Sequence, residues 1–176
     1  KVINKPALVP WALKMAGEYL DANMPLGEPI DEISKKKLID GAKKAHKIKF
    51  DDAGDLGTIF HNLVEKFVKK QPYEMPVNEI LKRSFNQFLE WARDNKVVFK
   101  SSERKIYSRK HNYAGTIDIT GTMNGENVLF DIKTSSGIWN EYWFQVAAYL
   151  MALREEYPEI DARKMVIIRC GKDGAF

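Results

Sequence analysis

Two aspartates and a lysine lie on either side of an Asn-Gly pair within strand-forming residues. Such a pair, here Asn124-Gly125, predicts a tight type I′ turn. With these two residues as the loop, Asp118 and Asp131 lie opposite each other on adjacent strands, with Cβ atoms about 4.5–5.5 Å apart. Lys133 points to the same face as Asp131. Because opposed anions repel unless a cation lies between them, the spacing indicates a divalent metal site.

The apolar residues of the same segment agree with this register. Ile117 is expected to lie opposite Ile132. Ile119 is expected opposite Phe130, so that the second face of the hairpin is apolar and can pack on a core. The pairing holds for a loop of two or four residues but not of three. The alternative is a hairpin with one wet face and two solvated aspartates.

Three further polar features could belong to the same site. His61 and Glu65 share one face of a predicted helix at the edge of its apolar arc, where a histidine can point into a cleft but is more often a boundary residue. Gln145 and Tyr149 have the same spacing on an apolar helix, where a buried amide must be hydrogen-bonded, in the core or to a site residue or phosphate. Glu103 could join the acidic cluster or pair with a neighbouring lysine.

The elements that must position these residues change along the chain from helices to strands. Amphipathic periodicity predicts four helices first, over residues 7–21, 31–47, 59–70 and 78–94. Gly54 and Gly57 are expected to separate the second helix from the third, with Thr58 as an N-cap. The pattern then predicts three strands, a helix and a buried strand, over residues 102–109, 115–123, 126–134, 140–156 and 164–170. This order predicts an α/β core preceded by N-terminal helices.

Length and composition narrow the classes of protein. The 176 residues, 44% hydrophobic and 30% charged, fit one globular domain. No apolar run approaches the length of a membrane helix. Cys170 is the single cysteine, which excludes an internal disulfide and a cysteine-bound cluster and favours a reducing, cytoplasmic setting. The net charge of +4 permits nucleic acid as a partner. Because the chain begins with Lys1, a fragment of a longer protein is expected.

Other conspicuous residues have ordinary interpretations as well as functional ones. A run of lysines could form a solvated face or neutralise phosphates; it comprises Lys35, Lys36, Lys37, Lys43, Lys44 and Lys47. Trp139, Tyr142 and Trp143 could stack on bases, although core packing is expected of them. No glycine loop with nucleotide-binding spacing is present. Cys170, within an apolar strand, is expected to be structural.

Four motifs, in order and spacing, resemble the PD-(D/E)XK nuclease superfamily and, within it, the RecB-like exonuclease branch. They are Gly57-Thr-Ile-Phe-His61, Tyr113-Ala-Gly-Thr-Ile-Asp118, Asp131-Ile-Lys-Thr-Ser135 and Gln145-Val-Ala-Ala-Tyr149. The resemblance covers about residues 55–170. It implies a restriction-endonuclease-like αβββαβ core with a mixed sheet. Residues 1–54 would be a helical N-terminal part and residues 55–176 the core of one nuclease domain, 1–176.

The resemblance also implies roles for particular residues. Asp118, Asp131 and His61, with the main-chain carbonyl of Ile132, would bind one or two Mg²⁺ or Mn²⁺ ions. Lys133 would orient the attacking water and stabilise developing charge, and it is expected to stay protonated beside the acids. The remaining candidates, which would support the site or contact DNA, are Gln145, Tyr149, Glu103 and Glu65. Relatives with an iron–sulfur cluster are set aside, since one cysteine cannot hold one.

The expected function is therefore that of a metal-dependent DNA nuclease, an exonuclease acting on linear DNA. A helicase or recombination partner is compatible with it. The alternatives are an endonuclease, a non-catalytic nucleic-acid-binding module on the same fold, and an interaction domain in which the hairpin acids are incidental. Polarity, strand preference and oligomeric state are left open by these residues.

Overall fold

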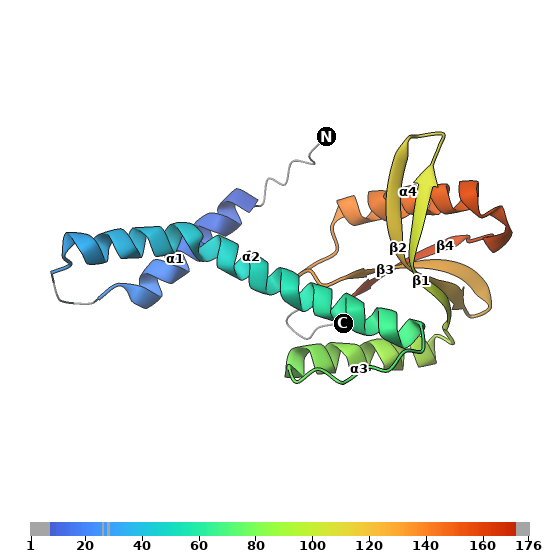
Figure 1. Cartoon of the computed structure of the whole chain (residues 1–176), viewed down its shortest axis with the longest axis horizontal. Coiled ribbons are helices and arrows are strands. Elements are labelled where there is room, and N and C mark those ends of the chain that lie inside the picture. Colours follow the sequence, from blue (N-terminus) through green and yellow to red (C-terminus); the bar gives the residue numbers. More distant parts are fainter. Residues whose placement is uncertain (1–7, 26, 28, 172–176) are drawn as a thin grey trace. The chain divides into compact units, whose positions relative to one another are not determined.

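Two units make up the chain, Lys1–Asp55 and Leu56–Phe176. The structure is a computed structural model that describes residues 8–25, 27 and 29–171. The first unit is helical, and the second is an α/β unit with a four-stranded mixed sheet (Figure 1). No helix among the described residues has an apolar stretch long enough to cross a bilayer. That both units act as one nuclease domain stays a prediction.

The helical unit pairs α1 (Leu8–Asn23) with the N-terminal part of α2 (Glu32–Val68). Asp31 precedes α2, and its carboxylate accepts a hydrogen bond from the Ser34 N–H at 2.7 Å, as an N-cap does. Met15 of α1 and two alanines of α2, Ala42 and Ala45, are buried. The predicted helix at 7–21 is thus confirmed over residues 8–21, since residue 7 lies outside the described residues, and the predicted helix at 31–47 is confirmed from Glu32 onward.

The predicted break at Gly54 and Gly57 is wrong, because α2 runs through both glycines to Val68. Thr58 lies inside the helix and is not an N-cap. A glycine costs a helix interior only about 1 kcal/mol, which continuous hydrogen bonding and packing can offset. At Gly57 the missing side chain makes room instead, because an added Cβ would lie 2.8 Å from Thr134 Oγ1.

The sheet of the second unit has the strand order β1-β2-β3-β4. Its strands are β1 (Val98–Ser108), β2 (Tyr113–Met123), β3 (Glu126–Lys133) and β4 (Lys164–Arg169). The first three are antiparallel neighbours, and β3 pairs with β4 in parallel. A parallel pair needs a crossover, and α4 (Asn140–Glu156) with a short 3₁₀ turn (Pro158–Ile160) supplies it.

Helices cover both faces of this sheet (Figure 1). On one face lie α3 (Glu79–Asp94), begun by the Asn78 cap, and the C-terminal part of α2. Their core cluster centres on buried phenylalanines, namely Phe60, Phe85, Phe88 and Phe130. On the other face, α4 buries Val146, Leu150 and Leu153 against the sheet. The predicted α/β class is confirmed, and β1 begins four residues earlier than the predicted strand at 102–109.

The hairpin has the predicted register near its turn. Met123 pairs with Glu126, and pairing continues to Ile119 with Phe130, where the β2–β3 ladder ends. Ile119, Phe130 and Ile132 join the cluster under α2 and α3, as expected of one apolar face. Ile117 instead joins the cluster under α4, so the prediction is wrong for this residue. The regular pleat is interrupted between them, at Asp118.

Candidate metal centre

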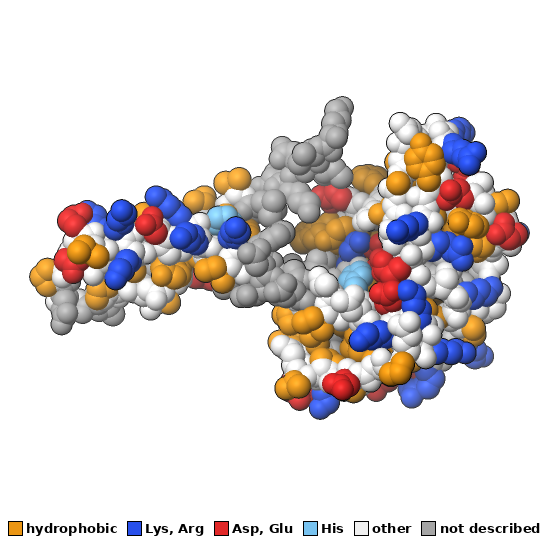
Figure 2. Space-filling view, in the orientation of Figure 1, with side chains coloured by type: hydrophobic (Ala, Val, Ile, Leu, Met, Phe, Trp, Pro, Cys, Tyr) orange, Lys and Arg blue, Asp and Glu red, His pale blue; other side chains and the backbone are white. Residues whose placement is uncertain are grey.

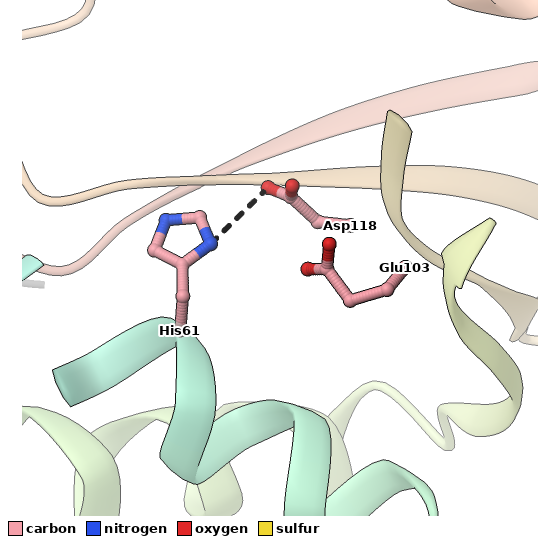
Figure 3. Close-up of side chains that lie close together, drawn as sticks. All are labelled: His61, Glu103 and Asp118. Carbon is pink, nitrogen blue, oxygen red and sulfur yellow. Dashed lines mark ion pairs between the residues drawn. The ribbon is translucent and has the colours of Figure 1, made fainter. Parts of the chain in front are cut away.

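Three residues from three separate elements converge beside the sheet (Figure 3). His61 projects from α2, Glu103 from β1 and Asp118 from β2, and one ligand atom from each lies within 4.8 Å of the others. His61 Nδ1 is 3.9 Å from Asp118 Oδ2. Figure 2 shows acidic side chains grouped with a histidine on this face of the α/β unit. Each residue is far from the others in sequence, so the fold brings them together.

The strand register explains why Glu103 and Asp118 meet. Ser102 pairs with Ile119, and Arg104 pairs with Ile117. Glu103 therefore lies level with Asp118 on the neighbouring strand. Its backbone is left-handed, with φ of 51°, a conformation that is uncommon for residues other than glycine, asparagine and aspartate. β1 is thus irregular at the residue that faces the acidic group.

Asp118 and Asp131 were predicted to be a directly opposed pair, but the ladder ends one step before them. Asp118 Oδ2 instead accepts a hydrogen bond from the Ile132 N–H at 2.6 Å. Asp131 is 2% exposed, and its Oδ2 lies 2.7 Å from Lys133 Nζ. This contact is an ion pair without hydrogen-bond angles. Asp131 is outside the converging group, so its role as a ligand, like that of the Ile132 carbonyl, stays a prediction.

Lys133 is held by a chain of polar contacts that reaches α4. Gln145 Oε1 accepts a hydrogen bond from Lys133 Nζ at 3.1 Å, and Gln145 Nε2 donates to the Tyr149 hydroxyl at 2.9 Å. The ring of Tyr142 lies 5.0 Å from the ammonium. Gln145 is exposed, so it is not a core glutamine. Gly115 leaves space for Tyr149, since an added Cβ would lie 2.3 Å from its ring.

Burial and neighbouring negative charges govern the ionisation of the site. Burial raises the pKa of Asp118, and burial followed by the charge of Asp118 and then Glu65 raises the pKa of Glu103. Burial also raises the pKa of Asp131 to about 6, against the opposing effect of Lys133. Burial lowers the pKa of His61, which favours the neutral imidazole that binds metals. A bound cation would offset the cost of ionising the acids.

The donor set fits a hard divalent cation. Carboxylate oxygens suit Mg²⁺ and Mn²⁺, and a neutral imidazole is compatible with Mn²⁺. Ligand distances near 2.0–2.1 Å for Mg²⁺ place ligands on opposite sides about 4 Å apart. The mutual separations within 4.8 Å in the group of His61, Glu103 and Asp118 are close to that requirement.

The remaining predicted residues lie near the site or outside it. Glu65 is paired with Lys69, and its charge contributes to the raised pKa of Glu103. Trp139 and Trp143 are 52% and 44% exposed, so the expectation of core packing is wrong for both. Cys170 is buried, and burial raises the pKa of its thiol to about 12, consistent with a structural role.

From the sequence, Glu103 could either join the acidic cluster or pair with a neighbouring lysine, and in the structure it lies in the converging group. The signal that could have shown this was the register of β1 against β2, which brings it level with Asp118. That register depends on a turn without a distinctive sequence. No protein-family model matches the chain, and no curated protein matches it. The class that can be stated is an α/β chain with a candidate metal centre.

Proposed function

We propose that the chain is a metal-dependent DNA nuclease that hydrolyses phosphodiester bonds, with linear DNA as its expected substrate. The observation that carries the proposal is a group of metal-type ligands next to a positioned ammonium. His61, Glu103 and Asp118 form this group. Lys133, held between Asp131 and Gln145, supplies the ammonium. Phosphodiester hydrolysis needs both an activated water and relief of phosphate charge.

The chain's own residues support this division of labour. Asp118 is oriented by the Ile132 N–H, which leaves its carboxylate near His61 Nδ1. Lys133 carries the positive charge that would stabilise a phosphate as its charge develops. Gln145 and Tyr149 fix the direction of that ammonium through their hydrogen bonds. Mg²⁺ or Mn²⁺ bound by the acids and His61 would supply a water of lowered pKa and screen the phosphate.

The arrangement of elements is a second support. α2 or α3, then β1, β2 and β3, then α4 and β4 follow the αβββαβ order expected of a restriction-endonuclease-like core. The mixed sheet is of the expected kind. One fold can host many functions, so the residues of the site, and not the fold, are the main support for nuclease activity. The resemblance of the four motifs adds to it.

The deciding experiment compares digestion of linear and covalently closed circular DNA by the purified full chain with Mn²⁺. Wild-type protein is expected to degrade linear DNA and to stop when chelator is added. Asp131→Ala is expected to abolish digestion. Asp94→Ala is the matched control, because Asp94 is an exposed helix residue paired with Arg93 and outside the site. Equal activity of Asp131→Ala and wild type would overturn the proposal.

The two substrates separate the alternatives. Degradation of linear DNA alone identifies an exonuclease, whereas cutting of the closed circle identifies an endonuclease. If neither substrate is cut but DNA still binds, the chain is a non-catalytic binding module. Calorimetry with Mn²⁺ then shows whether the metal centre exists without catalysis.

A further inference from the structure

The exposed side chain of Glu103 brings a carboxylate to the group of His61 and Asp118. It lies close to Asp118, and the charges of Asp118 and Glu65 both oppose its ionisation. It makes no hydrogen bond or ion pair with any residue that the structure describes. The charge of Lys69 acts to lower the pKa of Glu103, but Lys69 is itself paired with Glu65. A carboxylate held among anions without a cationic partner is unfavourable unless something positive joins it.

We propose that Glu103 is a direct ligand of the catalytic cation, together with His61 and Asp118. This inference rests on the proposed nuclease function and deepens it. The motifs that carry the family resemblance do not contain Glu103, so its assignment comes from the geometry of this chain. It would give the centre ligands from a helix and two strands.

The positions of the three ligands are set independently of one another. Asp118 is oriented by the Ile132 N–H on β3. Glu103 is brought level with it by the β1–β2 register and turned by its left-handed backbone. His61 projects from α2 toward Asp118 (Figure 3). Their ligand atoms converge within 4.8 Å, which is close to the separation of about 4 Å between opposite ligands of one small cation.

Charge balance indicates how many cations the protein holds by itself. Glu103, Asp118 and Asp131 together carry three negative charges when ionised, and Lys133 carries one positive charge. One divalent cation balances the two charges that remain. A second cation would leave an excess positive charge, which a DNA phosphate would have to balance. The protein without DNA is therefore expected to bind one cation at this centre.

The test is calorimetric titration of the metal-free full chain with Mn²⁺, without DNA, in wild type and four variants. Wild type is expected to bind roughly one ion. Glu103→Gln, which keeps the length of the side chain but removes its charge, should weaken Mn²⁺ binding about 10-fold or more, since even outer-sphere substitutions cost 10–100-fold. Asp118→Asn should weaken it at least as much.

Glu65→Gln is the matched control, because it removes an equal charge near Glu103 from a residue outside the converging group. It should change the affinity by less than about threefold, since a nearby charge alone is partly screened by solvent. Glu103→Asp provides a second variant if Glu103→Gln fails to fold, as shown by its thermal unfolding in chelator. Its shorter carboxylate should also bind Mn²⁺ more weakly than wild type.

The outcomes distinguish a failure of Glu103 as a ligand from a failure of the proposed nuclease function. If Glu103→Gln or Glu103→Asp binds Mn²⁺ like wild type while Asp118→Asn does not, Glu103 is not a ligand and the proposed metal centre stands without it. Equal weakening by Glu65→Gln and Glu103→Gln would mean that Glu103 acts only through its charge, which also overturns the inference. Two ions bound at this centre without DNA would contradict the charge balance. If wild type binds no Mn²⁺, both proposals fail.

Discussion

The two ends of the β2–β3 hairpin are held together by different interactions. Near the turn, backbone pairs follow one another without interruption from Met123 and Glu126 to Ile119 and Phe130. Beyond that point the ladder ends, and a side chain, Asp118, takes the N–H of Ile132. One end is ordered by backbone pairing and apolar burial. The other is ordered by side-chain contacts among charged groups.

The difference shows that burial stabilises the folded protein at the regular end of the hairpin and destabilises it at the charged end. Phe130, at the regular end, is fully buried between the rings of Trp91 and Phe99. Asp131, the next residue, is almost as buried, but burial raises its pKa. Burying an aromatic ring is favourable, whereas burying a carboxylate is costly unless it is compensated. Neighbouring residues of one strand therefore make opposite contributions.

The largest effect is expected at the charged end, for catalysis. Lys133→Ala removes the ammonium that Asp131 and Gln145 hold. The rate of DNA cleavage with Mn²⁺ should fall by about 10³-fold or more, as on loss of one strong electrostatic stabiliser. The measurement is single-turnover cleavage of linear DNA. Lys82→Ala, an exposed lysine of α3, is the control; a similar loss in both variants would show that the effect is not specific to the site.

The regular end should respond in stability rather than in chemistry. Phe130→Ala leaves a cavity beside Trp91 and Phe99 and should lower the free energy of unfolding by about 3–5 kcal/mol. Chemical denaturation measures this. Phe144→Ala is the matched control, because Phe144 is 73% exposed and its loss should cost less than about 0.5 kcal/mol. Equal losses at the two positions would contradict the assignment of Phe130 to the core.

The same contrast explains how much could be predicted from the sequence. The Asn-Gly turn and the alternation of apolar residues are local signals. They correctly predicted the strand pairs from Met123–Glu126 to Ile119–Phe130. The bounds of α3 and α4 were also predicted closely, because amphipathic periodicity marks α3 and Pro158 follows the end of α4. These elements require no knowledge of distant residues.

The features that were mispredicted or left open depend on contacts between distant residues. Ile117 lies in the core cluster under α4 instead of the one under α2 and α3. Its neighbour Asp118 accepts a hydrogen bond from the Ile132 N–H on the adjacent strand. Glu103 reaches the centre through the β1–β2 register. α2 continues through Gly57, where the lack of a side chain leaves room for Thr134. Composition and periodicity do not encode such contacts. The residue types of the site were therefore predictable, whereas the sequence left open whether Glu103 would join His61 and Asp118.

A smaller effect, of opposite sign to that of Phe130→Ala, is expected at Asp131. Its pKa in the folded protein, about 6, lies above the ordinary value of 3.8. The folded state therefore holds the proton more tightly, and stability falls as pH rises from about 4 to 6 and Asp131 ionises. Asp131→Asn removes this penalty. At pH 8, in chelator, the variant should be more stable than wild type by about 1–3 kcal/mol.

Denaturation at several pH values measures this difference. At pH 3.5 the two proteins should have nearly equal stability, because Asp131 is protonated in both states. Asp94→Asn, at an exposed position paired with Arg93, should show little pH-dependent gain. If Asp131→Asn is the less stable protein at pH 8, the ion pair with Lys133 outweighs burial and the contrast between the two ends of the hairpin fails.

The smallest effect is expected at the turn that sets the regular end. Gly125 has φ of 86°, and the preceding Asn124 has φ of 50°, as a type I′ turn requires. An added Cβ at Gly125 meets no atom within 4 Å. Gly125→Ala should therefore cost only the backbone strain of a left-handed alanine, about 1 kcal/mol in the free energy of unfolding. Metal binding should not change.

Gly17, inside α1, is the control that isolates the backbone, because an added Cβ there also meets no atom within 4 Å. Alanine is a better helix former than glycine, so Gly17→Ala should stabilise its helix by about 0.5–1 kcal/mol. The same added methyl group is thus expected to change the free energy of unfolding in opposite directions at two positions that are both open. Side-chain contacts cannot explain that difference. Stabilisation by Gly125→Ala would mean that the turn does not require positive φ, and the register that leads to Asp118 would lose its local cause.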